Sequence, residues 1–242
     1  MIESTISKLN AMRLHAMADK IRELANSPKG SSMNPLDFVA FLVDAEFGKR
    51  ENGKISRLLK NANIKQAMAC IENVEFSARR NLKKEVLVDV LTGAFIENKN
   101  NALINGPTGC GKSYLACALA NLACRKGKPT IYYRMSRFLE MLTAEKALGN
   151  YLKIIDKIGK LKLIVLDDLG PDVMNKEQRN LFLEIIEERY LTGSTIITSQ
   201  LPFEQWYEVF GDPTIADAIC DRLFHNAHKI QIQRDGDSMR KK

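Results

Sequence analysis

The sequence lacks the features that mark membrane-spanning and secreted proteins. None of its hydrophobic runs reaches the roughly 18 to 20 apolar residues that cross a bilayer. The first ten residues, MIESTISKLN, have no apolar centre of the kind found in a secretory signal. We therefore expect a cytoplasmic protein that makes no contact with a membrane.

Cysteine pairs and histidine clusters are missing as well. The five cysteines contain no C-x-x-C pair, and the three histidines, His15, His225 and His228, show no H-x-x-x-H or H-E pattern. The cysteines are Cys70, Cys110, Cys117, Cys124 and Cys220. We interpret them as small buried side chains, and we expect neither disulfide bonds nor a zinc site.

Basic residues are in excess, and many of them lie in one segment. The chain has 36 Lys and Arg against 29 Asp and Glu, a formal charge of +7. Between residues 49 and 65 a single acid, Glu51, accompanies six bases: Lys49, Arg50, Lys54, Arg57, Lys60 and Lys65. This run predicts a DNA-binding surface, because Lys and Arg displace counterions from nucleic-acid phosphates. The alternative is an ordinary solvated helix face.

Residues 1–69 predict a small, basic α-helical domain for DNA binding or assembly. Apolar residues recur at threes and fours from Ser4 to about Asn26, which indicates a helix with one apolar side. A second helix is expected from Pro35, with Asn34 as its cap, and a third over 51–61. Residues 70–81 are expected to form a linker.

From residue 82 to residue 242, predicted helices and strands alternate. The expected strands are 102–105, 129–134, 161–168, 194–200 and 228–233, and the expected helices are 82–97, 112–126, 135–147, 150–159, 176–191 and 215–224. Parallel neighbouring strands need crossover connections, which are usually helical. The pattern therefore predicts an α/β domain with a five-stranded parallel sheet.

A phosphate-binding loop carries most of the functional information. Residues 106–113 read GPTGCGKS, which matches G-x-x-x-x-G-K-[ST] between an apolar strand and a helix of small residues. Lys112 is expected at the β and γ phosphates, and Ser113 at a magnesium ion. The residues expected to contact the nucleotide are Gly106, Pro107, Thr108, Gly109, Cys110, Gly111, Lys112, Ser113 and Tyr114. The loop predicts a nucleoside triphosphatase.

Two adjacent carboxylates end the strand over 161–168, in the arrangement called Walker B. Asp167 is expected to hold the magnesium ion, and Asp168 to orient or deprotonate the attacking water. The alternative is that the two acids merely cap the next helix.

The end of strand 194–200 offers a further candidate for positioning the water. We expect this strand beside the phosphate-loop strand, so that Thr198, Ser199 or Gln200 lies near the γ-phosphate. Gln200 is preferred, because its amide is both a donor and an acceptor.

Arg222 is the candidate arginine finger. The apolar residues of its helix, Ile219, Leu223 and Phe224, are expected to pack inward and to leave the guanidinium free to reach a neighbouring subunit. There it would offset the charge that develops during phosphoryl transfer. The alternative is a surface ion pair with Asp217 or Asp221.

Several longer segments together resemble one family. They are MRLHAMADKI, DFVAFLVDAEFGKRENGKISRLLKNANIK, GPTGCGKSYLACALANLACRKG, YYRMSRFLEML, LIVLDDLG, TIITSQLPFEQWYEVFGDPTIADAICDRLFHNAHKIQI and SMRK. This series, over nearly the full chain, resembles the IstB family of insertion-sequence helper ATPases, which are AAA+ proteins related to the DnaC helicase loaders. The resemblance implies a bacterial transposition helper that binds ATP and Mg²⁺, oligomerises on duplex DNA, remodels or bends that DNA and recruits a cognate transposase.

The family pattern supports the same site residues and shows two departures from the wider AAA+ pattern. Asp168 stands where most members carry Glu, so the carboxylate that activates the water is one methylene shorter. Few residues follow the last expected strand, which predicts a reduced or absent helical lid. Arg240 is a candidate second sensor, and contact of the basic tail with DNA is the alternative.

Two other functions remain open. A replicative helicase loader would use the helical domain as an ATP-controlled adaptor and would prefer single-stranded DNA. A small-molecule P-loop kinase is disfavoured, because no acceptor-binding lid is recognisable and Arg222 is a candidate for action on a neighbouring subunit.

Overall fold

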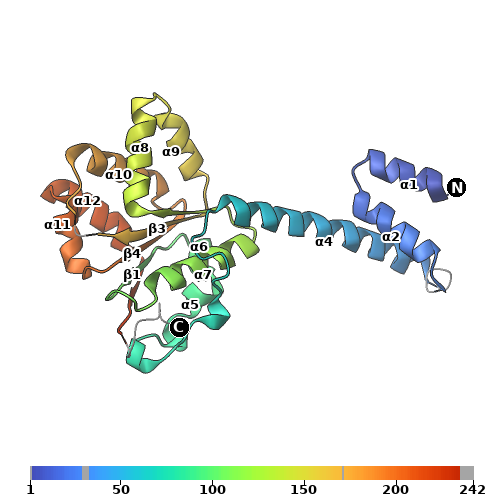
Figure 1. The fold of residues 1–242 in the computed structure, drawn as a ribbon, viewed down its shortest axis with the longest axis horizontal. Helices are drawn as coiled ribbons and strands as arrows, with labels where there is room; N and C mark the ends of the chain where they lie inside the picture. The colour runs from blue at the N-terminus through green and yellow to red at the C-terminus, as the bar shows by residue number, and fades with distance from the viewer. Residues whose placement is uncertain (1, 29–32, 171, 235–242) are drawn as a thin grey trace. The chain divides into compact units, whose positions relative to one another are not determined.

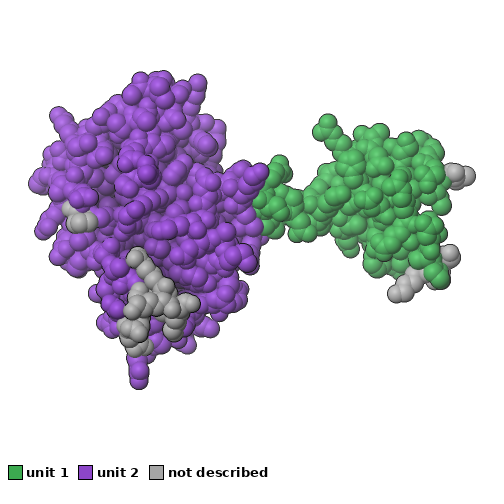
Figure 2. Space-filling model, in the orientation of Figure 1, with its two compact units in different colours: residues 1–57 green, residues 58–242 purple. Residues whose placement is uncertain are grey.

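A computed structural model describes residues 2–28, 33–170 and 172–234. The chain divides into two compact units, residues 1–57 and 58–242 (Figure 2). Arg240 and the rest of the basic tail lie outside the described residues. No helix in the described part of the chain is both long and apolar enough to cross a bilayer.

Unit 1 is helical, as expected, but its first helix is interrupted. The single helix predicted over 4–26 is two helices, α1 (Ile2–Ala11) and α2 (His15–Ala25), because Arg13 has a left-handed backbone with φ of 61°. Apolar side chains from both helices and from Leu42 form a small core: Ile6, Leu9, Ala18, Ile21, Leu24 and Leu42.

The helices expected from Pro35 and over 51–61 are one continuous helix, α4 (Pro35–Asn61). Asn34 is the cap that the sequence predicts, since its Oδ1 accepts from the Leu36 amide at 2.9 Å. Glu46, in the middle of α4, accepts from the Ala16 amide at 2.9 Å and so caps α2. Its other oxygen binds Arg50 Nε at 2.8 Å, and these bonds hold the pKa of Glu46 below its usual value.

The boundary between the two units falls within α4, between Arg57 and Leu58, and not at residue 69. The segment that follows α4 is held by unit 2. The Ala62 carbonyl accepts from the Tyr132 amide at 2.8 Å, and Asn121 Nδ2 donates to the carbonyls of Ala67 and Ala69 at 3.1 and 2.7 Å. Residues 58–69 therefore belong to unit 2, because their backbone hydrogen bonds are made there.

Unit 2 contains the predicted five-stranded parallel sheet. Its strands are β1 (Ala102–Asn105), β2 (Thr130–Arg134), β3 (Leu163–Leu169), β4 (Ser194–Ser199) and β5 (His228–Gln231). They lie in the order β2-β3-β4-β1-β5, and all neighbouring pairs are parallel. β4 is therefore beside β1, as expected, and the carboxyl ends of the two strands meet at one edge of the sheet.

Helices cover both faces of this sheet (Figure 1). They include α7 (Lys112–Arg125), α8 (Met135–Ala147), α9 (Tyr151–Gly159), α10 (Lys176–Arg189) and α12 (Pro213–Phe224). α7 packs on one face, where Leu115 and Leu119 meet Ile104 and Val165. α8, α10 and α12 pack on the other face, through side chains that include Phe138 and Phe182.

Three parts of unit 2 differ from the predicted elements. The helix expected over 82–97 is three short pieces, η3 (Lys84–Val86), α5 (Val88–Thr92) and α6 (Ala94–Glu97), and Gly93 separates the last two with a left-handed φ of 76°. The linker contains two short helices, η1 (Ile71–Asn73) and η2 (Ala78–Arg80). Two further short helices, η4 (Phe203–Gln205) and α11 (Trp206–Phe210), precede α12. These single turns are too short for a periodic apolar pattern to identify.

Candidate active site

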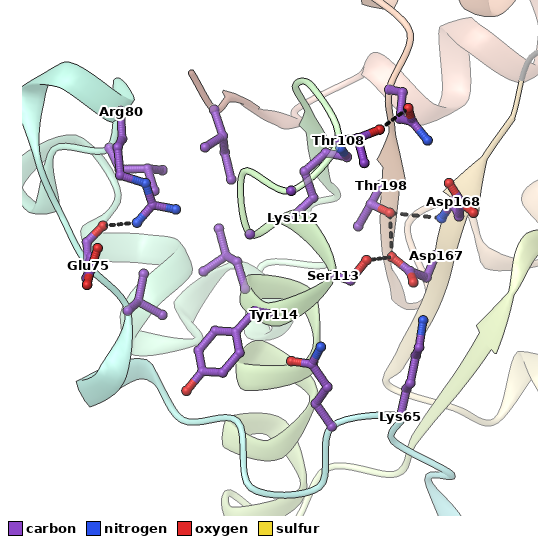
Figure 3. Close-up of a pocket in the computed structure, with 18 of the residues that line it drawn as sticks. Lys65, Glu75, Arg80, Thr108, Lys112, Ser113, Tyr114, Asp167, Asp168 and Thr198 are labelled. Carbon is purple, nitrogen blue, oxygen red and sulfur yellow. Dashed lines mark hydrogen bonds between the residues drawn. The ribbon is translucent and has the colours of Figure 1, made fainter. Parts of the chain in front are cut away.

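A cavity of about 690 Å³ lies at the carboxyl edge of the sheet (Figure 3). The phosphate-loop region and the ends of β2, β3 and β4 line it on one side, and residues from 65–82 line it on the other. Six of the nine predicted nucleotide contacts are in its wall: Thr108, Gly109, Gly111, Lys112, Ser113 and Tyr114. Gly106, Pro107 and Cys110 belong to the loop but not to the wall of the cavity.

Glycine is required at two positions of the loop. Gly106 has φ of 150°, and a Cβ there would lie 2.2 Å from the Ile232 carbonyl oxygen. Gly111 has φ of 93° and is the N-cap residue of α7, so it provides no side chain for the first-turn amides of that helix. Those amides and the positive end of the helix dipole suit a phosphate group.

Lys112 lies across the loop. Its side chain is nearly buried, and Nζ donates to the carbonyl oxygens of Gly106 and Pro107 at 2.6 and 2.9 Å. The loop therefore holds an ammonium group in its concave side, where it can offset the charge of a polyphosphate.

Asp167 is the centre of a hydroxyl cluster. Its Oδ1 accepts from Ser113 Oγ at 2.8 Å and from Thr198 Oγ1 at 2.6 Å, and its Oδ2 accepts from Tyr132 Oη at 2.5 Å. The carboxylate is only 2% exposed. A carboxylate and a hydroxyl oxygen side by side are the hard ligands that Mg²⁺ binds, so Ser113 and Asp167 fit the metal site that the sequence predicts.

Tyr132 packs in the core with 6% of its surface exposed, and its hydroxyl group reaches the Asp167 carboxylate. Burial, and then the hydrogen bond to Asp167, raise the pKa of Tyr132. The hydroxyl therefore stays protonated and remains a donor to Asp167.

Asp168 has a left-handed backbone with φ of 69°, next to an irregularity in the pairing of β3 with β4. Its amide donates to Thr198 Oγ1 at 2.9 Å, so one threonine hydroxyl binds both acids of the Walker B pair. Its carboxylate lies 2.7 Å from Arg134 Nη2 at the end of β2. Neither acid caps the next helix, because Asn175 caps α10 through the Gln178 amide.

The three candidates at the end of β4 have different partners. Gln200 Oε1 accepts from Thr108 Oγ1 at 2.6 Å, which links the predicted sensor to the phosphate loop. Thr198 binds the Walker B pair. Ser199 Oγ donates to the Leu169 carbonyl at 2.7 Å and is buried away from the cavity wall. Gln200 and Thr198 remain candidates for contact with the attacking water.

Arg222 is distant from the cavity of its own chain. It lies at the amino edge of the sheet, where the side chain of Asn101, the residue before β1, donates to the Arg222 carbonyl at 3.3 Å. Ile219 and Leu223 pack inward as expected, but the guanidinium is not free. It lies 3.0 Å from Glu187 and also donates to the Ala218 carbonyl. Its ion-pair partner is therefore on α10, not Asp217 or Asp221.

The six residues of the predicted DNA-binding run have different surroundings. Arg50 is bound to Glu46, and Lys54 lies 3.9 Å from Glu51. Lys49, Arg57 and Lys60 are exposed on α4. Lys65 is exposed too, but it lies in the wall of the cavity and not on α4.

Arg80 is a site residue that the sequence did not indicate. It is buried behind the phosphate loop, where Nη2 donates to the Cys110 carbonyl at 2.7 Å and Nη1 donates to the Glu75 carbonyl. A Cβ on Gly111 would approach its guanidinium to 3.0 Å. No motif surrounds Arg80 in the sequence, and only the folded chain brings it to the loop.

Sequence comparison identifies relatives over almost the whole chain. The profile of the family described as IstB-like ATP binding protein matches residues 7–242. An insertion sequence ATP-binding protein of Sinorhizobium fredii is 37% identical over 237 residues, which cover 98% of this chain and 96% of that protein.

Solved structures with the same fold come from replication proteins. The crystal structure of the DnaC helicase loader matches with a TM-score of 0.54 and 19% identity, over 68% of this chain and 96% of that one. The replication initiator DnaA bound to AMPPCP and single-stranded DNA matches with a TM-score of 0.57 and 20% identity, over 70% of this chain and 51% of that one. At this identity the likeness concerns the fold, the α/β P-loop fold of AAA+ proteins.

Proposed function

Because the chain belongs to the family of IstB-like ATP-binding proteins of insertion sequences, we propose that it is an ATP-dependent transposition helper. In this proposal it oligomerises on duplex DNA, remodels or bends that DNA, and recruits a cognate transposase. The observation that carries the proposal is the contact of Ser113 with Asp167 beside Lys112, in a cavity built by the phosphate loop.

ATP hydrolysis is the reaction that this site supports. Lys112 and the first amides of α7 would hold the phosphates, and Ser113 and Asp167 would hold Mg²⁺, which offsets phosphate charge. Asp168 would orient the attacking water or accept its proton. To do so it must leave Arg134, which now binds its carboxylate at 2.7 Å. Gln200 would hydrogen-bond the same water.

A neighbouring subunit would complete the site through Arg222. Since Arg222 lies at the amino edge of the sheet, it can contact a nucleotide only in another copy of the chain. Release from Glu187 would free its guanidinium for that contact. ATP can promote such assembly only if the assembled state binds ATP more tightly than the single subunit does.

Duplex DNA would contact the exposed bases of α4, namely Lys49, Lys54, Arg57 and Lys60, with Arg50 contributing after release from Glu46. A helicase-loader function is the second candidate, because the matched structures include the DnaC loader and a DnaA complex with single-stranded DNA. The two functions differ in which form of DNA the ATP-bound protein prefers.

Binding to duplex and single-stranded DNA, with and without a non-hydrolysable ATP analogue, tests the proposal. We expect duplex binding that the analogue strengthens and that weakens steeply with salt. Replacing Lys54, Arg57 and Lys60 together with Gln should weaken duplex binding for all sequences and leave nucleotide binding unchanged. A preference for single strands would favour the loader, and absence of DNA binding at every salt concentration would refute both.

A further inference from the structure

We infer that Lys65 binds the terminal phosphate of the nucleotide, as a second ammonium group in the site beside Lys112. This inference rests on the proposed function, because it takes the cavity to be the ATP site. In this inference Lys65 acts in the catalytic cavity, and not on the DNA-facing surface that its place in the basic run predicts.

The backbone around Lys65 is fixed on both sides. Before it, the Ala62 carbonyl accepts from the Tyr132 amide of β2 at 2.8 Å. After it, Asn121 on α7 binds the carbonyls of Ala67 and Ala69. A side chain that starts from so restrained a segment can contribute to a defined site, because little backbone entropy is lost when it binds.

The side chain of Lys65 extends into the cavity. Figure 3 shows it directed toward Asp167, and both residues belong to the cavity wall together with Ser113 and Asp168. These are the residues that would surround Mg²⁺ and the γ-phosphate. An ammonium group at this position would face the part of ATP that ADP lacks.

Lys65 differs from the other cations of the cavity in its partners. Lys112 is held by two loop carbonyls, Arg80 by the Cys110 carbonyl, and Arg134 by Asp168. For Lys65, no ion pair or side-chain hydrogen bond occurs within the described part of the chain, although three carboxylates, Glu75, Asp167 and Asp168, line the same cavity. It is therefore the cation of this group that can bind a phosphate without first breaking a bond.

The position of Lys65 also connects the nucleotide to the helical part of the chain. Helix α4 ends at Asn61, only a short segment before Lys65. Loss of the terminal phosphate on hydrolysis would remove the partner of Lys65 and release its side chain. The segment that leads out of α4 would thus respond to the difference between ATP and ADP.

Calorimetric titration of the full chain with a non-hydrolysable ATP analogue and with ADP, both with Mg²⁺, tests the inference. Lys65→Met should weaken binding of the analogue by about tenfold or more, the usual loss for a hydrogen bond to a charged group, and should leave ADP affinity within about twofold. Lys65→Arg should restore most of the preference for the analogue. The control Lys60→Met, on exposed α4, should change neither affinity.

Three results would overturn the inference. They are unchanged affinity of Lys65→Met for the analogue, an equal loss for the analogue and ADP, and reduced duplex affinity of that variant without nucleotide. Lys65→Gln gives a second readout if Lys65→Met does not fold. Failure of the ATP site on which the inference rests is distinguishable, because the unaltered chain would then bind neither nucleotide, whereas failure of the inference alone leaves binding that Lys112→Ala abolishes.

Discussion

The two edges of the sheet use buried polar side chains in different ways. At the carboxyl edge, the side chains around the metal-site carboxylate and the sensor amide bind one another: Ser113, Thr198 and Tyr132 donate to Asp167, and Thr108 donates to Gln200. Lys112 and Arg80 donate to backbone carbonyls of the phosphate loop. At the amino edge, side chains bind mostly the backbone, and Arg189 is the main example.

Arg189 is 2% exposed and joins two segments of backbone at the amino edge. It donates to the carbonyls of Ile158, Leu161 and Ser194, at 2.9, 3.1 and 2.5 Å. Burial lowers the pKa of Arg189 to about 10. Near it, Asn101 accepts from the Thr195 amide and donates to the Leu223 carbonyl, so the same edge also holds the end of α12.

The comparison shows how one sheet separates stability from function. Backbone carbonyls cannot move away from the side chains that bind them unless the chain unfolds. The hydrogen bonds at the amino edge therefore stabilise the fold and do not rearrange. Side-chain hydroxyls, carboxylates and cations can exchange partners by rotating, so the carboxyl edge can accept a nucleotide and a metal ion. Mutations at the two edges should therefore affect different measurements.

The largest effect is expected at the amino edge. Arg189→Met keeps much of the side-chain volume but removes the buried guanidinium that donates to three carbonyls, so the free energy of unfolding should fall by about 3 to 5 kcal/mol. Affinity for MgATP should be unchanged under conditions where the variant is folded. Chemical denaturation measures the first quantity and calorimetry the second.

Arg137→Met is the matched control for Arg189→Met. The Arg137 side chain is 77% exposed, and among the described residues it pairs only with Glu140 on its own helix. Its loss should change the free energy of unfolding by no more than about 0.5 kcal/mol. A similar small change in Arg189→Met, or a large loss of nucleotide affinity in the folded variant, would contradict the division between the edges.

Arg222 lies at the amino edge, but it is the candidate arginine finger for a neighbouring subunit. It therefore tests whether a residue of the amino edge can act in catalysis on another subunit. Arg222→Ala should lower kcat for ATP hydrolysis by about a thousandfold and leave the stability and MgATP affinity of one subunit nearly unchanged. Glu187→Gln, which removes the ion-pair partner and keeps the guanidinium, should retain activity. Normal turnover by Arg222→Ala at concentrations that saturate assembly would exclude the finger.

A smaller effect is expected from Tyr132→Phe, which removes only the hydroxyl that donates to Asp167. The Mg²⁺ concentration for half-maximal ATP binding should rise by about tenfold, because groups that orient a metal ligand tune its affinity. Tyr133→Phe is the control. It removes the hydroxyl of the next residue in β2, which is not the hydroxyl that donates to Asp167. An equal Mg²⁺ requirement in the two variants would show that Tyr132 only packs in the core.

The sheet and the centre of the site could be predicted because their signals are local in sequence. Buried apolar runs ending in Asp167 or Thr198 indicate strands, and the glycines from Gly106 to Gly111 specify a backbone that other residues cannot adopt. Parallel pairing then brings these strand ends together. For these elements, the local sequence pattern and the parallel order of the strands predict the same arrangement of the site residues.

The parts that could not be predicted depend on single residues or on distant contacts. The left-handed Arg13 divides a periodic apolar pattern without changing it, and Gly93 does the same for the segment before β1. Arg80 and Lys65 reach the site only because residues 58–82 fold back over α7. The sequence places Lys65 in the basic run, and proximity in sequence gives no sign of the cavity.

The central claim is that the carboxyl edge, with Lys112 and Asp167, is where this chain binds a nucleoside triphosphate with its metal. Calorimetric titration of the unaltered chain and of Lys112→Ala with Mg²⁺ and a non-hydrolysable ATP analogue tests it most directly. We predict clear binding by the unaltered chain and a loss of about a hundredfold or more in a variant that remains folded. No binding by the unaltered chain, or equal binding by both proteins, would contradict the account.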